Sequence, residues 1–572
     1  MRLDKLTVGS GKDSPTHQFK NLKNVTIDFD QEHWVTVVIG WNGTGKSNVL
    51  EALAIIFRDL IAKKRMPTFA FQLRYRIGTG KNLRHIDIDA DPDREKDAFI
   101  IHVADAGEVK QNVVVHNILD FGDDAHTSPK GKPIKLTAFL NADAEYLPRY
   151  VFSYYSGESG RMHEVFRPYL ESYDNKLRNG VDPGLKRLFY AMPVHSQFVL
   201  LAFLIQQSDA VRAFLDDHLG LDPDEGIESV LFVLRQPPWK SKAPDGDSRF
   251  WNARGIVSIF LSRLYDVALA PVEISRRVPT SIWNEKTLQF KYLYVKDIAA
   301  LRSLVGEQTP AEFFRDLEST YVSELIEEVR IRVRLKKNDG SVTFRELSEG
   351  EQQLLTVLGL LRFTAEKDSL FLLDEPDTHL NPRWCVDYLT YLKSFVGHNN
   401  EGEDNSHIVL TTHNPLAVAE LVREQVQILK RNDETRQVES RSPDFDPRGM
   451  GYAGIVTSDM FGLAAALDTH TQGLLEKKRL LSLKDGPLTE KEREELEQIN
   501  LELDGYGFRY SARDPLFEEY LRARFHFEAA QPDGERLNQR SSAERREKAR
   551  ELVEQAAAKV KLEQQGSIDA SN

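Results

Sequence analysis

The sequence is poor in cysteine, in long apolar runs and in net positive charge. It has one cysteine, Cys385, in 572 residues, which excludes an intramolecular disulfide and a cysteine-rich zinc site. No stretch approaches the roughly 20 apolar residues of a membrane span, and the N-terminal residues lack the apolar segment of a signal peptide. We therefore expect a soluble protein of a reducing compartment, the cytoplasm, without membrane contact.

The formal net charge is −13, so the chain as a whole is not suited to bind a polyanion. A nucleic-acid contact would need a local basic face. One candidate is the run 329–335, where Arg330, Arg332 and Arg334 alternate with apolar residues and so share one face of a predicted strand. That face either contacts a phosphate backbone or is a solvated face salt-bridged to its neighbours.

A glycine-rich loop lies between a strand-like apolar run, residues 34–39, and a helical pattern that begins at Asn48. It fits G-x-x-x-x-G-K-[ST] without a mismatch and comprises Gly40, Trp41, Asn42, Gly43, Thr44, Gly45, Lys46 and Ser47. Strand, loop and helix in this order are the context that a phosphate-binding loop, or Walker A motif, requires. The sequence therefore predicts that the chain binds a nucleoside triphosphate.

The residue types in this loop each have a chemical reason. Glycines let the backbone fold close around the β-phosphate, so that amide hydrogens and the positive end of the following helix converge on anionic oxygens. Lys46 would reach the β- and γ-phosphates, and the Ser47 hydroxyl would be a Mg²⁺ ligand.

A second apolar run, residues 370–373, ends in two carboxylates, Asp374 and Glu375. This is the Walker B form. Asp374 would hold Mg²⁺, directly or through water, and Glu375 would orient and polarise the attacking water. Two adjacent acids can take two roles because successive side chains diverge at the end of a strand.

Two further motifs have an ordinary structural explanation when each is taken alone. Ser348 precedes a helical run and is a plausible N-cap, whose hydroxyl and first free amides would point outward as an anion site. The apolar run 408–412 ends at His413. The first could be only a capped helix, and the second only a structural histidine.

Together, in this order, the four motifs resemble those of an ABC-type ATPase head. Asn48 directly after the Lys-Ser pair and the long separation between Walker A and the 347–353 signature make the chain look like the SMC/RecF-like branch and not a transporter subunit. The resemblance implies ATP and Mg²⁺ as cofactors, with Asn48 added to the nucleotide-binding residues of the loop. It also implies Lys46, Glu375 and His413 as catalytic residues.

The resemblance further implies a dimer in which two heads sandwich two nucleotides, or a higher even-numbered oligomer. His413 would contact the γ-phosphate in its own protomer, while Asp377 and Asn381 would lie in the segment that crosses the interface. The signature residues would contact ATP held by the opposite protomer; they are Ser348, Glu349, Gly350 and Glu351. The signature departs from the commoner Leu-Ser-Gly-Gly-Gln, and no glutamine marks a Q-loop, for which Ser153 to Gly157 is a guess by position.

Within that branch the chain is similar to the PtuA-type ATPases of Septu and retron anti-phage systems, on the strings 154–157, 374–382 and 457–463. This implies an ATP-hydrolysing regulator or sensor whose ATP-dependent head dimerisation controls a separate HNH-type nuclease. A reverse transcriptase with its msDNA would be a further partner in a retron. The alternative is a DNA-repair or recombination clamp acting directly on DNA, and a stand-alone transporter subunit ranks last.

The sequence contains no nuclease centre that we recognise. Asp444 and Asp446 flank Phe445 in a loop bounded by prolines, which is typical of a turn. No strand ending in a Glu-Gly pair precedes them, as a Toprim-type nuclease would need, and the histidines lack the spacing of an HNH site. Cutting would therefore belong to a separate subunit.

The predicted fold class is α/β, a P-loop ABC-ATPase head with a two-lobed mixed β-sheet and flanking helices. We expect residues 1–165 to form lobe I with Walker A, 166–330 a compact, mainly helical insertion, 331–440 lobe II, and 441–572 a charged helical C-terminal extension. Strand-like runs at 71–77, 98–103 and 113–115 predict an antiparallel sheet beside the P-loop core. The aromatic run 150–157 predicts a strand that either delivers a loop to the nucleotide or is simply buried.

Overall fold

The computed structural model describes residues 1–30, 32–105, 131–157, 160–205, 207, 209–222, 224, 226–240, 244–279, 284–336, 341–364, 368–396, 406–432, 434–463, 465–484, 488–506, 516, 520, 523–524, 527 and 542–569. The chain divides into two compact units. The first comprises Met1–Ala417 and Glu424–Arg441, and the second comprises Val418–Arg423 and Ser442–Asn572.

One sheet of the first unit has seven strands in the order β18-β17-β3-β16-β15-β8-β9. Neighbouring strands are parallel except for β17 and β18. The strands are β3 (Val35–Gly40), β8 (Val151–Tyr155), β9 (Leu188–Tyr190), β15 (Leu370–Asp374), β16 (His407–Thr411), β17 (Val426–Arg431) and β18 (Val438–Arg441). Every residue of β15 and β16 is buried, as expected for parallel strands covered on both faces.

A second, six-stranded sheet is antiparallel throughout and confirms the sheet predicted beside the P-loop core. In the order β2-β1-β4-β5-β6-β7 it contains β1 (Arg2–Val8), β2 (Val25–Asp28), β4 (Phe71–Ile77), β5 (Arg84–Ala90), β6 (Phe99–Asp105) and β7 (Lys132–Ile134). The short helices α3 (Leu136–Asn141) and α4 (Asp143–Tyr146) follow β7. The strand predicted at 113–115 lies outside the described residues.

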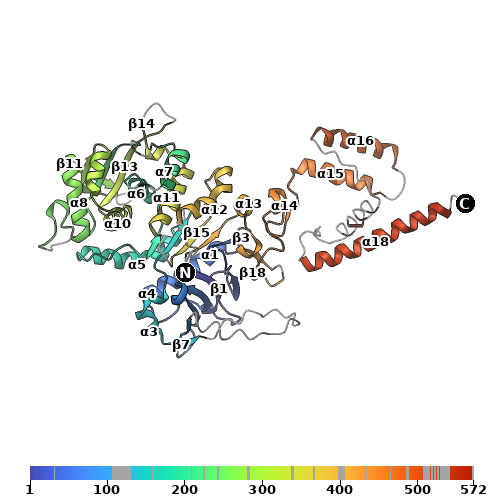
Figure 1. Ribbon diagram of the computed structural model, residues 1–572, viewed down its shortest axis with the longest axis horizontal. Helices are drawn as coiled ribbons and strands as arrows, with labels where there is room; N and C mark the ends of the chain where they lie inside the picture. Colours follow the sequence, from blue (N-terminus) through green and yellow to red (C-terminus); the bar gives the residue numbers. More distant parts are fainter. Residues whose placement is uncertain are drawn as a thin grey trace. The chain divides into compact units, whose positions relative to one another are not determined.

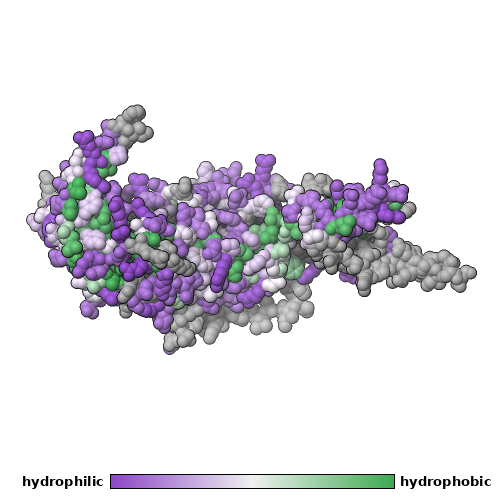
Figure 2. Space-filling view, turned by 90° about the horizontal axis from the view of Figure 1, so that it is seen from above, coloured by the Kyte–Doolittle hydropathy of each residue, from purple (hydrophilic) through white to green (hydrophobic). Residues whose placement is uncertain are grey.

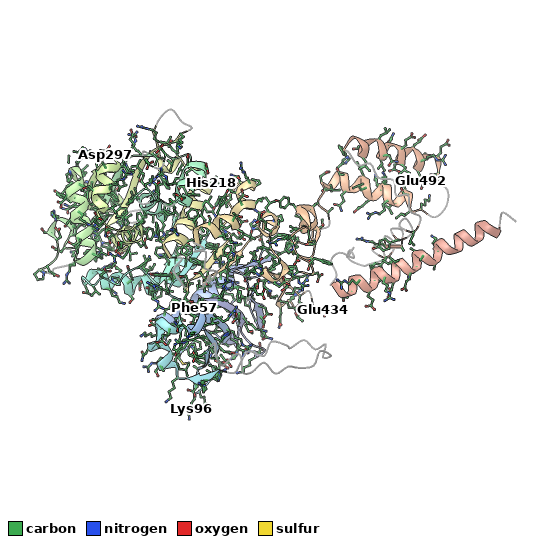
Figure 3. The ribbon with its side chains drawn as sticks, in the orientation of Figure 1. Phe57, Lys96, His218, Asp297, Glu434 and Glu492 are labelled. Atoms are coloured by element: carbon green, nitrogen blue, oxygen red, sulfur yellow. The ribbon has the colours of Figure 1, made fainter. Side chains whose placement is uncertain are left out.

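Helix α1 (Lys46–Ile61) joins the two sheets into layers (Figure 1). It contacts β3, β8, β15 and β16 of the seven-stranded sheet, and its apolar residues share one core with the strands of the six-stranded sheet. Phe57, labelled in Figure 3, meets the ring of Tyr75 on β4 edge-on, with 5.7 Å between ring centroids. A helix that is apolar nearly all round is expected between two such layers.

Residues 161–343 contribute both helices and a third sheet. The helices are α5 (Arg161–Arg178), α6 (Val194–Phe203), α7 (Asp209–Ala213), α8 (Gly255–Val267), α9 (Ile298–Val305) and α10 (Pro310–Val322). The sheet, in the order β11-β12-β10-β13-β14, contains β10 (Ile227–Arg235), β11 (Leu269–Pro279), β12 (Glu285–Val295), β13 (Ile326–Arg334) and β14 (Ser341–Thr343). The expected helical insertion therefore also holds a sheet, because a continuous apolar run such as β10 does not distinguish strand from helix by its period.

Strand β13 shows the predicted alternation, with Arg330, Arg332 and Arg334 exposed and the intervening residues buried. Arg330 pairs with Glu328 at 2.9 Å. In the same sheet β11 leaves Leu269, Val272 and Ile274 exposed. Figure 2 shows hydrophobic side chains at the surface at the left-hand end of the view, where β11 is labelled in Figure 1.

Helices α11 (Glu349–Thr364) and α12 (Pro382–Val396) pack on each other, and α11 also packs closely on α6. The two helices lie close together at Gly359, where an added Cβ would be 2.0 Å from Cγ1 of Val199. The short helix α13 (Pro415–Val418) follows β16.

The second unit is helical, with α14 (Gly451–Thr457), α15 (Thr469–Ser482), α16 (Glu490–Gly505) and α18 (Ser542–Asp569). Helices α15 and α16 contact each other, and Lys484 bonds Glu492 at 2.6 Å. At the start of α16 the backbone N–H and the hydroxyl of Thr489 both donate to Oε2 of Glu492, at 2.9 and 2.8 Å. None of the described helices combines the length and apolarity that a bilayer crossing needs.

Candidate nucleotide-binding site

The predicted motifs meet at one edge of the seven-stranded sheet. Gly40, Asp374 and Thr411 end β3, β15 and β16, and β16 lies between the other two strands. Parallel strands have their carboxyl ends at the same edge, so these three residues and the loops after them are neighbours. Asp374 stands opposite Thr411 in the strand register.

The loop between β3 and α1 has a backbone that only glycine adopts without strain at Gly45, where φ is +101°. A Cβ there would lie 2.8 Å from Oδ1 of Asn21. Asn21 braces the loop, because its amide donates to the Gly43 carbonyl at 3.1 Å. Asn48, which was predicted to bind nucleotide, donates to Asn21 at 2.7 Å and so helps to hold Asn21 against the loop.

The first part of the loop is exposed and the second part is buried. Trp41 is 61% exposed, and Asn42 and Gly43 are exposed beside it. Thr44 and Gly45 are buried, and the Thr44 hydroxyl donates to the Trp41 carbonyl at 2.8 Å. The exposed part of the loop is thus accessible to a ligand, while the buried part is held in place by its own hydrogen bonds.

Lys46, the first residue of α1, is buried. Its Nζ donates to the Gly40 carbonyl at 2.8 Å, back across the loop. Burial lowers the pKa of Lys46, and the charges of Glu375 and Asp374 oppose that shift. The ammonium therefore lies in the loop, close enough to both carboxylates to feel their charge.

Asp374 is 2% exposed, and burial raises its pKa. Hydrogen bonds from the hydroxyls of Thr411 and Ser47 oppose that rise, while the neighbouring Glu375 adds to it and Arg161 counters it. The structure thus brings together Ser47 and Asp374, the two predicted Mg²⁺ ligands, although 326 sequence positions separate 47 from 374. A hydroxyl and a buried carboxylate are oxygen donors of the kind that Mg²⁺ prefers, so these residues fit the ion.

Glu375 lies directly after β15 with φ at +49°, an unusual conformation for a residue with a side chain. Its backbone N–H donates to the Thr411 carbonyl at 3.0 Å. Its Oε1 lies 3.3 Å from Nδ1 of His413. Glu375 and His413, predicted as catalytic from separate motifs, are therefore neighbours at the sheet edge.

The signature residues form a separate group at the start of α11. Ser348 caps this helix in a capping box, since its hydroxyl and backbone N–H both donate to Oε2 of Glu351, at 2.8 and 2.7 Å. Ser348 and Glu349 are exposed and Gly350 is buried. Within the described residues, the side-chain bonds of Ser348 go to Glu351 and none reaches the P-loop.

The segment after Walker B connects the two groups. Asp377 is buried, which raises its pKa, and it accepts a bond from the Thr412 hydroxyl at 2.8 Å. Gln353 of α11 donates to the Pro376 carbonyl at 2.6 Å. Asn381 is exposed and accepts from the backbone of Trp384 at 3.0 Å, at the start of α12.

The sequence interpretation missed two residues of the site. Thr411 bonds both Asp374 and the backbone N–H of Glu375. Arg161 has a guanidinium nitrogen 3.7 Å from Oδ2 of Asp374 and lies over the ring of Tyr155. The sequence did contain a signal for Arg161. A cation in the first turn of a helix is unfavourable beside the positive end of the helix dipole, so an arginine there indicates a role outside the helix.

The run 150–157 is strand β8 and lies beside β15. The Ser156 N–H donates to the Asp374 carbonyl at 3.2 Å, and the Thr378 hydroxyl lies 3.4 Å from that of Ser156. The strand therefore ends beside Asp374, and delivery of its loop to a nucleotide stays a prediction. Ser153 itself is fully buried within the sheet.

Comparisons with known proteins match the two segments of the chain that carry the predicted motifs. The family described as "AAA domain, putative AbiEii toxin, Type IV TA system" matches residues 247–419, and the AAA ATPase domain matches residues 17–132. Septu protein PtuA of Bacillus mycoides (strain KBAB4) is 24% identical over 201 residues, which cover 33% of this chain and only 27% of the relative's length.

Two solved structures were also found, each 10% identical with a TM-score of 0.30 over 77% of this chain. They are the SMC head domain from Thermotoga maritima, covered over 99% of its length, and the Smc head domain with an extended coiled coil bound to the C-terminal domain of ScpA derived from Pyrococcus furiosus, covered over 96%. Two segments of the chain are thus similar to AAA-type ATPase domains: residues 17–132, which hold the glycine-rich loop, and residues 247–419, which hold the carboxylate-ended strand of the same sheet.

Proposed function

We propose that this chain binds and hydrolyses ATP with Mg²⁺ and acts as a regulator or sensor subunit of a cytoplasmic anti-phage complex. The observation that carries the proposal is the meeting of Ser47, Asp374 and Glu375 at one sheet edge. Lys46 and His413 lie in the same place, within reach of the two carboxylates. These are the groups that phosphoryl transfer to water requires.

Each side chain has a task in this proposal. Lys46 exchanges its bond to the Gly40 carbonyl for one to the β- and γ-phosphates, and its charge stabilises the transferring group. Glu375 orients the attacking water and takes up its proton, and His413 supports Glu375 and donates to the γ-phosphate. Ser47 and Asp374 would hold Mg²⁺, which neutralises phosphate charge when bound.

The test of hydrolysis uses Glu375→Gln and Lys46→Ala in the full chain. Loss of a general base typically reduces the rate by about 10²- to 10⁴-fold, so the Gln variant should bind labelled ATP yet release little phosphate. The Ala variant should fail to bind. Glu439→Gln, an exposed change on β18, is the matched control and should behave as wild type. Normal turnover in both site variants would refute the catalytic assignment.

We also propose that a second copy of the chain completes the site. Support comes from Ser348, which is exposed and whose side-chain bonds within the described residues reach only Glu351. The N-terminus of α11 is suited to an anion, but the Glu351 carboxylate occupies it in the isolated chain. ATP bound to a partner copy would compete with that carboxylate for the hydroxyl and amide of Ser348.

Complementation between two inactive variants tests this composite site. Lys46→Ala and Ser348→Ala are each expected to lack activity. In an equimolar mixture half of the dimers pair the two variants, and one of their two sites then has both intact residues, so about a quarter of wild-type activity should return if the sites act independently. If Ser348 serves the nucleotide of its own chain, mixing restores nothing.

The anti-phage role rests on the partial relationship to Septu PtuA and on the AAA match. The separate nuclease would be of the HNH type, with a reverse transcriptase and msDNA as further partners in a retron. If an HNH-type nuclease is encoded beside this chain's gene, co-expression of the two proteins, followed by purification in ATP, should give a stable complex. The variant Glu375→Gln should retain that complex, and separate elution of the two proteins in both nucleotide states would count against the role.

Direct action on DNA is the alternative, and one observation favours it. Arg332 and Arg334 are exposed on β13, and neither pairs with an acidic side chain in the part of the chain that the structure describes. A salt titration of DNA binding by the wild type and by Arg332→Ala/Arg334→Ala separates the two proposals. A DNA clamp should lose affinity steeply with salt, and the double variant should show a shallower slope.

A further inference from the structure

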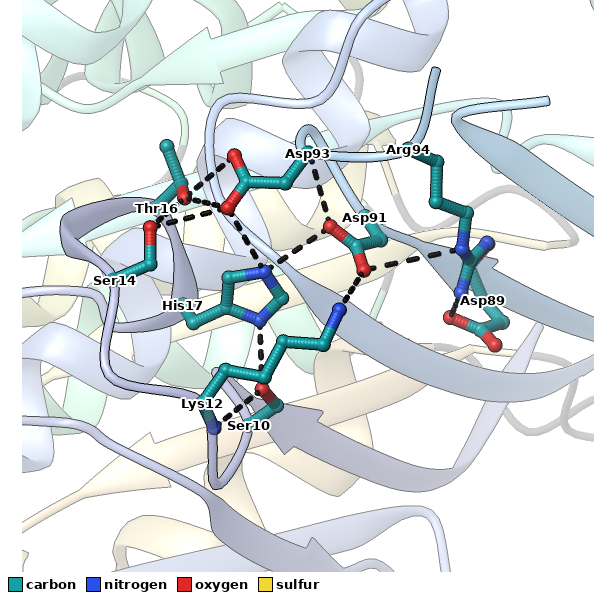
Figure 4. A network of polar contacts seen from close by, with 9 residues as sticks. All are labelled: Ser10, Lys12, Ser14, Thr16, His17, Asp89, Asp91, Asp93 and Arg94. Atoms are coloured by element: carbon teal, nitrogen blue, oxygen red, sulfur yellow. Dashed lines mark hydrogen bonds and ion pairs between the residues drawn. The ribbon is translucent and has the colours of Figure 1, made fainter. Parts of the chain in front are cut away.

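A polar cluster on the six-stranded sheet lies apart from the residues assigned to ATP. His17 ends the short helix η1 (Pro15–His17), and Asp91 and Asp93 lie in the turn between β5 and β6. Each of the three offers one ligand atom, and these atoms all lie within 4.8 Å of one another (Figure 4). Two segments that are far apart in sequence thus converge through an imidazole and two carboxylates.

The imidazole is aimed between the carboxylates without being satisfied by them. Its Nε2 lies 3.2 Å from Oδ1 of Asp91 and 3.2 Å from Oδ2 of Asp93. The His17 ring is only 1% exposed, and Nε2 has no hydrogen-bond partner within the described residues. Nε2 thus makes two ion-pair contacts but no aligned hydrogen bond to either carboxylate, which leaves a buried nitrogen that a further partner could satisfy.

The spacing suits a metal ion. Zinc bonds to histidine nitrogen and carboxylate oxygen are about 2.0–2.2 Å long, so two ligands at adjacent corners of a tetrahedron lie roughly 3.3 Å apart. Both distances from Nε2 to oxygen are 3.2 Å. The third pair, the two carboxylate oxygens, lies within 4.8 Å, and it would close to roughly 3.3 Å for all three atoms to contact one tetrahedral ion.

Surrounding side chains hold the three groups in orientation. The Ser10 hydroxyl lies 2.6 Å from Nδ1 of His17 and fixes the ring. The Thr16 hydroxyl donates to Asp93 at 2.9 Å, and the backbone N–H of Asp93 donates to Asp91 at 2.9 Å. Such outer contacts are typical of metal ligands, whose tautomer and rotation they set.

The local charge also leaves room for a cation. Lys12 bonds Oδ2 of Asp91 at 2.9 Å and so balances one carboxylate, on the oxygen that does not face His17. Within the described residues, Asp93 faces His17 and has no lysine paired with it.

We propose that His17, Asp91 and Asp93 bind a divalent first-row transition metal, with Zn²⁺ and Mn²⁺ as the ions to try. One imidazole nitrogen and two carboxylate oxygens suit this class, while Mg²⁺ and Ca²⁺ prefer oxygen alone. The ion would clip the loop at 10–17 to the turn after β5. Asn21, four residues beyond His17, braces the P-loop through Gly43, so the clip would anchor the segment that supports the nucleotide loop.

The test titrates ZnCl₂ or MnCl₂ into the full-length, EDTA-treated protein and measures binding by calorimetry. Nucleotide is left out and Mg²⁺ is in excess, so that the titration does not measure binding at the proposed Ser47–Asp374 site. We expect one ion per chain and a melting temperature that rises with its concentration. Asp93→Asn should weaken binding at least about ten-fold, and because its side chain is 42% exposed the variant should fold. Asp13→Asn, a fully exposed carboxylate on the same loop, is the matched control and should bind as wild type.

X-ray absorption at the zinc edge gives an independent readout. It should show a ligand shell of nitrogen and oxygen that includes one imidazole, and His17→Gln should remove the imidazole contribution. Equal affinity in wild type and Asp93→Asn, or failure of both ions to bind the wild type, would overturn the proposal. In that case the cluster is a buried histidine flanked by two acids with a structural role only.

Discussion

Replacing Thr411 with valine would remove a hydroxyl donor from the buried carboxylate of Asp374. The Thr411 hydroxyl donates to Oδ1 of Asp374, and the Glu375 N–H lies 3.2 Å from the same hydroxyl oxygen. Because Asp374 is almost inaccessible to water, no solvent molecule can replace the lost donor. Valine keeps the β-branched shape that suits β16, so the strand should be retained.

The size of the effect follows from the charge on the acceptor. A hydrogen bond to a charged group contributes about 1.5–3 kcal/mol, which corresponds to a loss of roughly 10- to 150-fold in kcat/KM if the transition state needs Asp374 in place. The bond from Thr411 also lowers the pKa of Asp374 against the rise caused by burial. In the valine variant the pKa of Asp374 should therefore rise further.

The pH dependence has a definite sign. The proposed Mg²⁺ ligand is ionised Asp374, so the acid-side loss of ATPase activity should begin at a higher pH in Thr411→Val than in wild type. An acid whose folded pKa lies above its unfolded value favours folding below the unfolded pKa, and this contribution is lost as pH rises through the folded pKa. The variant should thus lose stability at neutral pH but not at acid pH.

The assay is phosphate release at saturating Mg²⁺ from mildly acidic to mildly alkaline pH, with a urea unfolding curve at both ends of that range. Thr411→Ser keeps the hydroxyl and is the control, for which we expect nearly wild-type behaviour. An unchanged acid limb together with unchanged kcat/KM in Thr411→Val would show that Asp374 does not depend on this bond.

Three further predictions concern the rest of the first unit. Burial would raise the pKa of Glu318, but His195 and Lys186 beside it hold that pKa at about 2. Glu318→Gln should lower the free energy of unfolding, measured in urea at neutral pH, by about 3–5 kcal/mol. The wild type should lose this stability as pH falls from the ordinary carboxyl pKa toward 2. Gly359→Ala should push α11 from Val199 and lower the melting temperature through about 1–3 kcal/mol of overpacking, whereas Gly473→Ala, which meets nothing within 4 Å, should not. Asn21→Ala should weaken binding of labelled ATP by about five- to ten-fold, since it loses a net hydrogen bond of about 1 kcal/mol, and should leave kcat unchanged.

Much of the site was predictable because its chemistry is local. The strand, glycine loop and helix around Lys46 form as the pattern indicates, and the Ser348 cap forms because a hydroxyl and an acid three residues apart meet within one turn. The sheet of residues 161–343 was not fully predicted, because apolar runs such as β10 do not reveal their period and β11 is exposed along nearly its whole length.

The contacts that the predicted residues make in the structure were not predicted from the sequence. Asn48 was expected at the nucleotide but bonds Asn21, and Glu351 was expected to face a partner's phosphate but bonds Ser348. Neither contact contradicts a role in the bound state, which stays a prediction. Thr411 and Arg161 were not predicted, because their importance depends on Asp374 being beside them.

Local sequence patterns were enough to predict the glycine-rich loop, the strand ending in two acids and the capped signature helix, because each depends on residues within a few positions of one another. No such pattern predicts that Ser47, Asp374 and Thr411 lie together or that His17 faces Asp91 and Asp93. The order of strands in the sheet brings these residues together and burial then shifts the pKa of Asp374. Strand order and burial arise from packing between distant segments, which no local pattern encodes.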